Sequence, residues 1–231
     1  MPHSQHPTRS LLVHRTARHA VVAAVMALAT LASLVAASPA FAAADAAFQS
    51  AFQSFSQASG GDKSAIDPAA EAFDSLLKAE PTSPVLMAYA GASTALKASN
   101  TSLPWKKMSF AEDGLAQVDK ALAMLTPAHD APLQRGTPGA LEVRFVAATT
   151  FLAMPAFMNR SERGAKLLGE VLASPLFERA PVPFRGAVWM RAAALAAKEE
   201  RKDDARKYFN EVIQHAAPQA DAARVKLKEL A

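Results

Sequence analysis

The sequence has no cysteine, few glycines and few aromatic residues. The absence of Cys from all 231 residues excludes a disulfide framework, a thiolate zinc site and a cysteine nucleophile. Only 9 Gly and 7% aromatic residues, with few β-branched side chains, argue against an all-β fold. Ala, Leu, Lys and Glu are abundant instead, and they favour helices.

Residues 1–42 have the pattern of a secretory signal peptide. Residues 1–19 contain three Arg and no acid, and an uncharged apolar run follows at 20–37. Ala40-Phe41-Ala42 then supplies a small-residue cleavage site. We therefore expect a cleaved signal at 1–42 and a periplasmic domain at 43–231. The alternative is an uncleaved N-terminal membrane anchor, because the apolar run is just long enough to cross a bilayer.

Removal of this segment changes the charge balance. The whole chain has 25 Lys and Arg against 21 Asp and Glu, a net charge of +4. The predicted signal holds three of the arginines and no acid, so the mature charge falls to +1. A nearly neutral domain gives no reason to expect a nucleic-acid partner.

The mature chain has helical periodicity throughout. Phe48, Phe52 and Phe55 are spaced four and three residues apart, which places them on one helix face. Asp67 and Pro68 have the residue types of an N-cap and a first helical position. No apolar run after the signal is long enough to span a membrane. Helices are expected in pairs at 44–58 and 67–79, 84–98 and 109–125, 138–154 and 161–173, and 182–198 and 202–216, followed by a final helix at 219–230.

Three segments share a spacing of small, large and apolar residues before a proline. They are Ala69-x3-Phe73-x2-Leu76-x4-Pro81, Ala205-x3-Phe209 with Pro218 beyond it, and a degenerate form, Leu115-x3-Asp119-x2-Leu122-x4-Pro127. This spacing is similar to that of the second helix of a tetratricopeptide repeat. There the small residue lets two helices approach closely, and the large one fills the gap to the next repeat.

The segments at 84–91, 104–108 and 142–145 resemble a loosely defined group of secreted bacterial tetratricopeptide-like proteins of unknown activity. The resemblance implies an envelope location and an all-α fold. That fold would be a right-handed superhelical stack of about four helical hairpins, capped by the polar helix at 219–230. It carries over no catalytic residues.

Residues 43–231 lack the common catalytic motifs. They contain no G-x-S-x-G, H-E-x-x-H, P-loop or G-x-G-x-x-G sequence, and their only histidines are His129 and His215. We therefore expect no catalytic, metal-binding or cofactor-binding residues.

Two arginines are the best candidates for a binding site. Arg144 and Arg191 lie in the first helices of consecutive pairs, and first helices line the concave surface of such a stack. Together they could bind a carboxylate or an acidic peptide, with Tyr89 as an aromatic neighbour. The alternative is a local ion pair, such as Arg144 with Glu142 or Glu170.

The two tryptophans differ in their surroundings. Trp105 lies in the amphipathic segment Pro104-Trp105-Lys106-Lys107, so it could stand at the rim of the groove or cover a gap between helices. Trp189 lies among small and apolar residues and is expected in the core.

These observations favour a non-catalytic scaffold that binds a peptide segment of another envelope protein on its concave face. One alternative is a receptor for a small molecule or cell-wall fragment, or an unfamiliar enzyme, either of which needs convergent polar groups in a pocket. A second is a self-associating module, which an exposed stripe of Phe48, Phe52 and Phe55 would favour.

Overall fold

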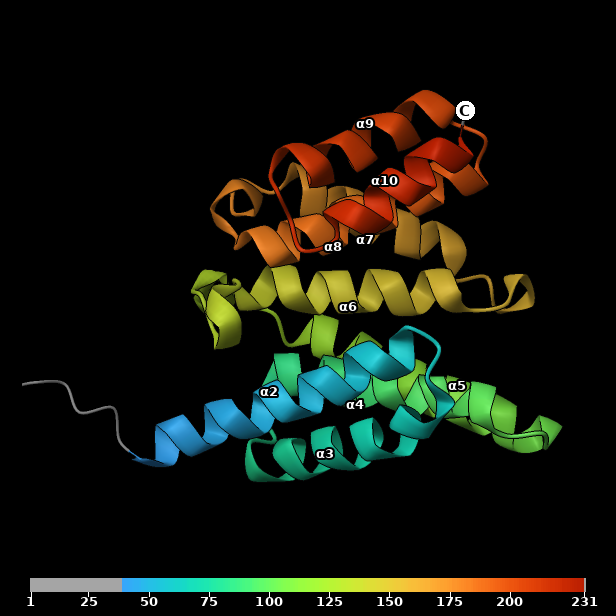
Figure 1. Ribbon diagram of the computed structural model, residues 1–231. Coiled ribbons are helices and arrows are strands. Elements are labelled where there is room, and N and C mark those ends of the chain that lie inside the picture. The colour runs from blue at the N-terminus through green and yellow to red at the C-terminus, as the bar shows by residue number, and fades with distance from the viewer. Residues whose placement is uncertain (1–38, 231) are drawn as a thin grey trace, which may run out of the picture. The chain divides into compact units, whose positions relative to one another are not determined.

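A computed structural model describes residues 39–230, and this part of the chain is all-α (Figure 1). It contains no β-strand. The helices are α2 (Pro39–Ser59), α3 (Ile66–Ala79), α4 (Pro84–Leu96), α5 (Pro104–Ala123), α6 (Gly139–Ala153), α7 (Ser161–Ala173), α8 (Val182–Lys198), α9 (Lys202–Gln214) and α10 (Ala220–Glu229). The predicted all-α class is confirmed. None of these helices has the length and apolar character that a bilayer span requires.

The chain divides by its internal contacts into Met1–Ala42 and Ala43–Ala231. Most of the predicted signal peptide lies outside the described residues. The predicted cleavage tripeptide at 40–42 falls in the first turn of α2.

Helix starts follow the local sequence, with two corrections. Ser83 caps α4, because its hydroxyl accepts a hydrogen bond from the Leu86 N–H at 3.4 Å. Asp67 is not the N-cap of α3; it lies inside the first turn of a helix that begins at Ile66. α5 begins at Pro104, five residues before the predicted start. The fixed φ of a proline suits a first helical position, and sequence reading had assigned this segment to a loop.

Helices that follow one another along the chain pack together. α4 packs against α3 and α5, α6 against α7, and α9 against α8 and α10. α4 also packs against α6, and α7 against α8. Phe48 of α2 contacts Phe73 of α3 and Tyr89 of α4 at ring-centroid distances of 5.8 Å. The aromatic stripe of α2 is thus turned toward α3 and α4.

The second helix of every predicted pair has a small residue, a large buried residue four positions later and an apolar residue three further on. The degenerate motif at Leu115 and Asp119 was placed one residue too late. The equivalent positions in α5 are Gly114 and Val118, which are both buried. Asp119 instead forms an ion pair with Arg160 at 3.1 Å. The four sets are Ala69, Phe73 and Leu76; Gly114, Val118 and Ala121; Gly164, Leu168 and Val171; and Ala205, Phe209 and Val212.

The small residues allow very close helix contacts. A Cβ atom added to Gly91 of α4 would lie 2.7 Å from the carbonyl oxygen of Gly114 in α5. A Cβ at Gly164 of α7 would lie 2.8 Å from the Leu152 side chain of α6. A side chain at Gly91 would require α4 and α5 to move apart, and one at Gly164 would require the Leu152 side chain to shift.

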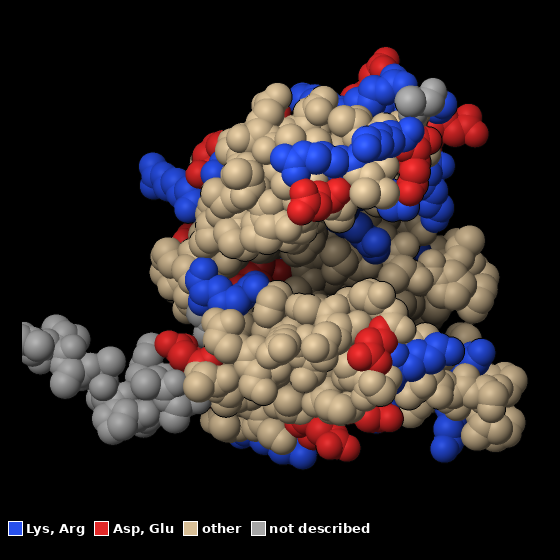
Figure 2. Space-filling view, in the orientation of Figure 1, with Lys and Arg blue, Asp and Glu red and all other residues tan. Residues whose placement is uncertain are grey.

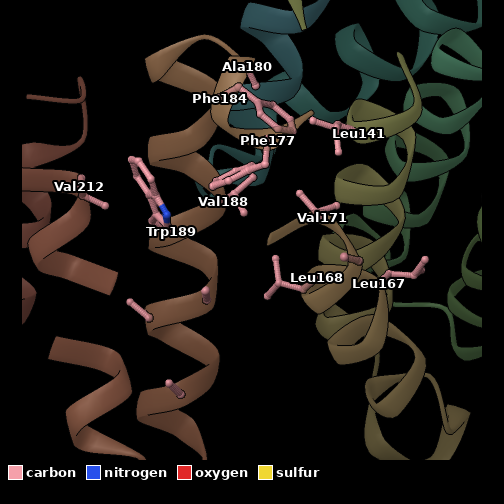
Figure 3. Close-up of a cluster of buried hydrophobic side chains, with 14 of the residues drawn as sticks. Leu141, Leu167, Leu168, Val171, Phe177, Ala180, Phe184, Val188, Trp189 and Val212 are labelled. Carbon is pink, nitrogen blue, oxygen red and sulfur yellow. The ribbon is translucent and has the colours of Figure 1, made fainter. Parts of the chain in front are cut away.

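Two large clusters of buried apolar side chains meet on α6. One lies mainly among α2, α3 and α4 and includes Val143 and Val146 of α6. The other extends to α10 and includes Ala147 and Phe151 of α6. Figure 3 shows part of the second cluster, in which Trp189 of α8 lies on the side toward α9. The expectation that Trp189 belongs to the core is confirmed.

Candidate functional site

The candidate site is the side of α6 that faces α4 and α8. Glu142, Phe145 and Thr149 follow one another on α6 at spacings of three and four residues, so they share one side of the helix. Glu142 meets Tyr89 of α4, and the Phe145 ring lies 5.4 Å from the Phe184 ring of α8. The space-filling view shows a hollow on one face of the molecule, with basic side chains at its edges and acidic atoms visible inside it (Figure 2).

Arg191 projects from α8 onto α6. Its Nη2 donates a hydrogen bond of 2.8 Å to the carbonyl oxygen of Thr149, and its Nε is buried without a partner. No carboxylate in residues 39–230 lies within 4.0 Å of it. Burial lowers the pKa of the guanidinium from its usual value, because the charged form has lost water. Arg191 therefore brings a half-buried positive charge with only a neutral partner.

Arg144 lies on α6 but is directed elsewhere. Its Nε is 4.0 Å from the Glu170 carboxylate of α7, and its Nη1 donates to the Ala140 carbonyl oxygen at 3.3 Å. The local ion pair with Glu170 is thus the alternative that the structure shows. No hydrogen bond in the described part of the chain joins Arg144 to Arg191 through a shared partner.

Tyr89 is not on an open surface, which corrects its predicted placement. It is 3% exposed, and its ring stacks on Phe73 at a centroid distance of 4.7 Å. Phe52 and Phe55 pack edge-on against the same ring at 5.9 and 5.1 Å. The Phe stripe of α2 covers Tyr89, because an apolar helix face is buried against the nearest apolar partner. The exposed stripe that would favour self-association is therefore not present.

A buried polar network lies at the α4 end of this side of α6. Glu142 is 1% exposed, and its Oε1 accepts hydrogen bonds of 2.7 Å from the Tyr89 hydroxyl and from Nη2 of Arg135. Its Oε2 is buried without a partner. Arg135 comes from the connection before α6, where its φ is 60°, and its guanidinium carbon lies 3.5 Å from the centre of the Phe52 ring.

Burial governs the protonation of this network. It raises the pKa of Glu142 from its usual value, against the opposing effect of the Arg135 charge. Burial and the Glu142 charge together raise the pKa of Tyr89 well above its usual value. In this network the Tyr89 phenol is neutral and donates a hydrogen bond to the Glu142 carboxylate, whose affinity for a proton is increased.

Sequence reading missed Arg135 and assigned Glu142 only a surface ion pair. The available signal was Glu142 itself, a lone acid in the otherwise apolar start of α6. A carboxylate in such a run must be paired when it is buried. Its partners could not be read from the sequence, because Tyr89 is 53 residues away and Arg135 lies in a connection.

Trp105 lies in the first turn of α5 and is 66% exposed. It does not cover a gap between helices, which corrects one of its two predicted roles. No hydrogen bond or aromatic contact within the described residues connects it with Arg144 or Arg191.

The two histidines of residues 39–230 have structural contacts. The Thr126 N–H donates to Nδ1 of His129 at 3.0 Å, which caps a short turn, and the His215 ring packs on Trp189 at 4.7 Å. Within residues 39–230 no cluster of three or more His, Asp or Glu side chains has the arrangement of a metal site. Comparisons of the chain with models of protein families, with curated proteins and with solved structures gave no match.

Proposed function

We propose that the chain is a non-catalytic, tetratricopeptide-like scaffold of the bacterial envelope. It binds an acidic peptide segment of another envelope protein on a concave face that includes the first helices α6 and α8, whereas α4 is buried along nearly its whole length. The single observation that carries this proposal is Arg191, a half-buried cation without a carboxylate partner in the described residues. A carboxylate of the peptide would supply the missing partner in a partly desolvated place, where charge-assisted hydrogen bonds are strong.

The helix contacts support a stack of repeats. α4 packs on α6, and α6 touches α8 through Phe145 and Phe184, so the first helices are neighbours in series. The small, large and apolar residues recur at matching positions in α3, α5, α7 and α9. Recurrent spacing of this kind is the signature of repeat architectures, in which each unit buries its core against the next.

Arg191 and Arg144 should contribute unequally to binding. Arg144 already has Glu170 at 4.0 Å, and a peptide carboxylate would have to compete with it. We therefore expect Arg191→Glu to abolish capture of the partner and Arg144→Glu to weaken it. This inequality distinguishes the structure-based proposal from the sequence-based one, which gave the two arginines equal weight.

The test is affinity capture from a periplasmic extract with residues 43–231 as bait. An acidic peptide synthesised from the sequence of the captured protein is then tested for direct binding. Arg224→Glu is the matched control, because Arg224 is an exposed arginine of α10 that ion-pairs with Asp221. Loss of the partner with Arg191→Glu but not with Arg224→Glu supports the proposal. Identical partner lists for all variants contradict it, and capture of a cell-wall fragment instead of a protein supports the receptor alternative.

A further inference from the structure

The first two turns of α5 are exposed to solvent. α5 has 20 residues, whereas the other second helices α3, α7 and α9 have 14, 13 and 13. Every residue from Ser102 to Ser109 is exposed, and packing against the body begins at Phe110 and Ala111. The exposed part of the helix is about 9 Å long at 1.5 Å per residue. Figure 1 shows α5 with its neighbours.

This exposed end, residues 103–109, is called the α5 tip. It carries three large apolar side chains, Leu103, Trp105 and Met108, all exposed in the structure. Met108 lines a surface hollow with Phe157 and Met158, but Trp105 is 66% exposed and contributes little to the packing of the body. Tryptophan is preferred where one side of a ring meets apolar material and the other meets water, as at the interface of a bilayer.

The charges of the α5 tip have one sign. Residues 81–111 contain no Asp or Glu, and two of their three lysines, Lys106 and Lys107, lie in the tip. Both lysines are exposed, and neither forms an ion pair with another described residue. The tip therefore presents apolar groups next to positive charge, which complements an anionic lipid headgroup layer.

The direction of the helix adds to this positive charge. The tip is the N-terminus of α5, where the helix dipole is positive, yet the first turn has no acid and no side-chain cap. Acids are favoured at such an end and lysines are not. Placing Lys106 and Lys107 there is unfavourable for the isolated helix, and an anionic surface removes the penalty.

We propose that the α5 tip docks on an anionic lipid surface. Trp105, Leu103 and Met108 enter the interfacial layer, and Lys106 and Lys107 contact lipid phosphates. This proposal does not depend on the peptide-binding role of α6 and α8.

The test uses the whole chain and the fluorescence of Trp105, which reports on the tip alone. Trp189 is the other tryptophan and is 5% exposed, so its emission is a constant background. The chain is titrated with phosphatidylcholine vesicles that contain phosphatidylglycerol or lack it. We expect a blue shift, and quenching by brominated lipid, only with the anionic vesicles. Trp105→Phe removes both signals.

Charge reversal then tests the role of the lysines. Each neutralised lysine should weaken binding to the anionic surface about fivefold, so Lys106→Glu/Lys107→Glu should weaken it by more than about 25-fold. Acids at a helix N-terminus are favourable, so this variant should fold, which circular dichroism checks. Lys207→Glu/Lys228→Glu, two exposed lysines of α9 and α10, makes the same change of net charge elsewhere and should bind within twofold of the wild type.

Three results would overturn the proposal. One is equal quenching of Trp105 in neutral and anionic vesicles, and another is equal loss of binding in the two lysine variants. The third is a Trp105 shift that depends on protein concentration but not on vesicles, which would make the tip a contact between copies of the chain. Binding of the apolar run at 20–37 to vesicles does not produce these signals, because the reporter is in α5.

Discussion

Gly114→Ala should destabilise the protein although alanine is the better helix former. A Cβ at this position would lie 2.5 Å from the Gly91 carbonyl oxygen and 2.6 Å from the Ala95 nitrogen. Carbon atoms in favourable contact are about 3.5–4.0 Å apart, so the added atom overlaps the backbone of α4 by about 1 Å. A backbone cannot escape by changing rotamer, and α4 as a whole would have to shift.

The magnitude follows from two opposing effects. Overpacking of a tight contact costs about 1–3 kcal/mol, and a clash with backbone places Gly114→Ala near the upper end. Replacing Gly by Ala inside a helix returns about 0.8–1.0 kcal/mol. The net loss is about 2 kcal/mol, which lowers Tm by about 4–8 °C for a domain of this size.

Gly169→Ala is the matched control. Gly169 is exposed on α7, and nothing lies within 4 Å of an added Cβ. This variant keeps the helix-propensity gain without the clash, so Tm should rise by about 2–4 °C. Thermal unfolding followed by circular dichroism at 222 nm measures both variants. If Gly114→Ala is as stable as Gly169→Ala, α4 and α5 do not cross at backbone contact and the packing argument fails.

Three further predictions concern the buried network and the core. The pKa of Glu142 is raised in the folded state, so the folded protein binds this proton more tightly than the unfolded chain does. The contribution of Glu142 to stability is therefore greatest below the ordinary pKa of 4.5 and is lost as pH rises through the folded pKa. Urea unfolding measured against pH should show that loss in the wild type but not in Glu142→Gln. Arg135→Ala leaves the Glu142 carboxylate without its cation and should cost about 3–5 kcal/mol at neutral pH. The cost should be clearly smaller at pH 4, and an equal cost at both pH values would show that the ion pair is not responsible. Phe73→Ala removes a fully buried ring and should cost about 3–5 kcal/mol in the same assay, whereas Phe157→Ala, at a ring 67% exposed, should change stability by less than about 0.5 kcal/mol.

Much of the fold could be predicted from the sequence, because local rules set the helices. The spacing of Phe48, Phe52 and Phe55 identified α2, and Trp189 among small residues was correctly expected in the core. The start of α5 was placed too late, because proline is equally compatible with a turn and with the first position of a helix, and Pro104 occupies the latter. The small, large and apolar spacing in α5 was placed one residue too late, because Leu115 is itself buried and only the ion pair of Asp119 with Arg160 shows that this alignment is wrong.

The candidate site was harder to predict, because its members meet only through tertiary contacts. The sequence placed Arg191 and Arg144 in first helices. It could not show that Glu170 pairs with Arg144, or that no carboxylate in the described residues pairs with Arg191. Tyr89 was taken for a surface residue, since an isolated helix shows its polar hydroxyl but not the aromatic face of α2 that covers it.

Membership of α6 in both large clusters has a consequence for motion in the folded protein. Opening of the cluster among α2, α3 and α4, or of the cluster that extends to α10, uncovers only one side of α6 and leaves the other side packed. Amide hydrogens in the middle of α6, around Val146 and Ala147, can meet solvent only when both clusters open together. In hydrogen–deuterium exchange they should therefore be the last to acquire deuterium, with exchange becoming faster toward α2 and toward α10.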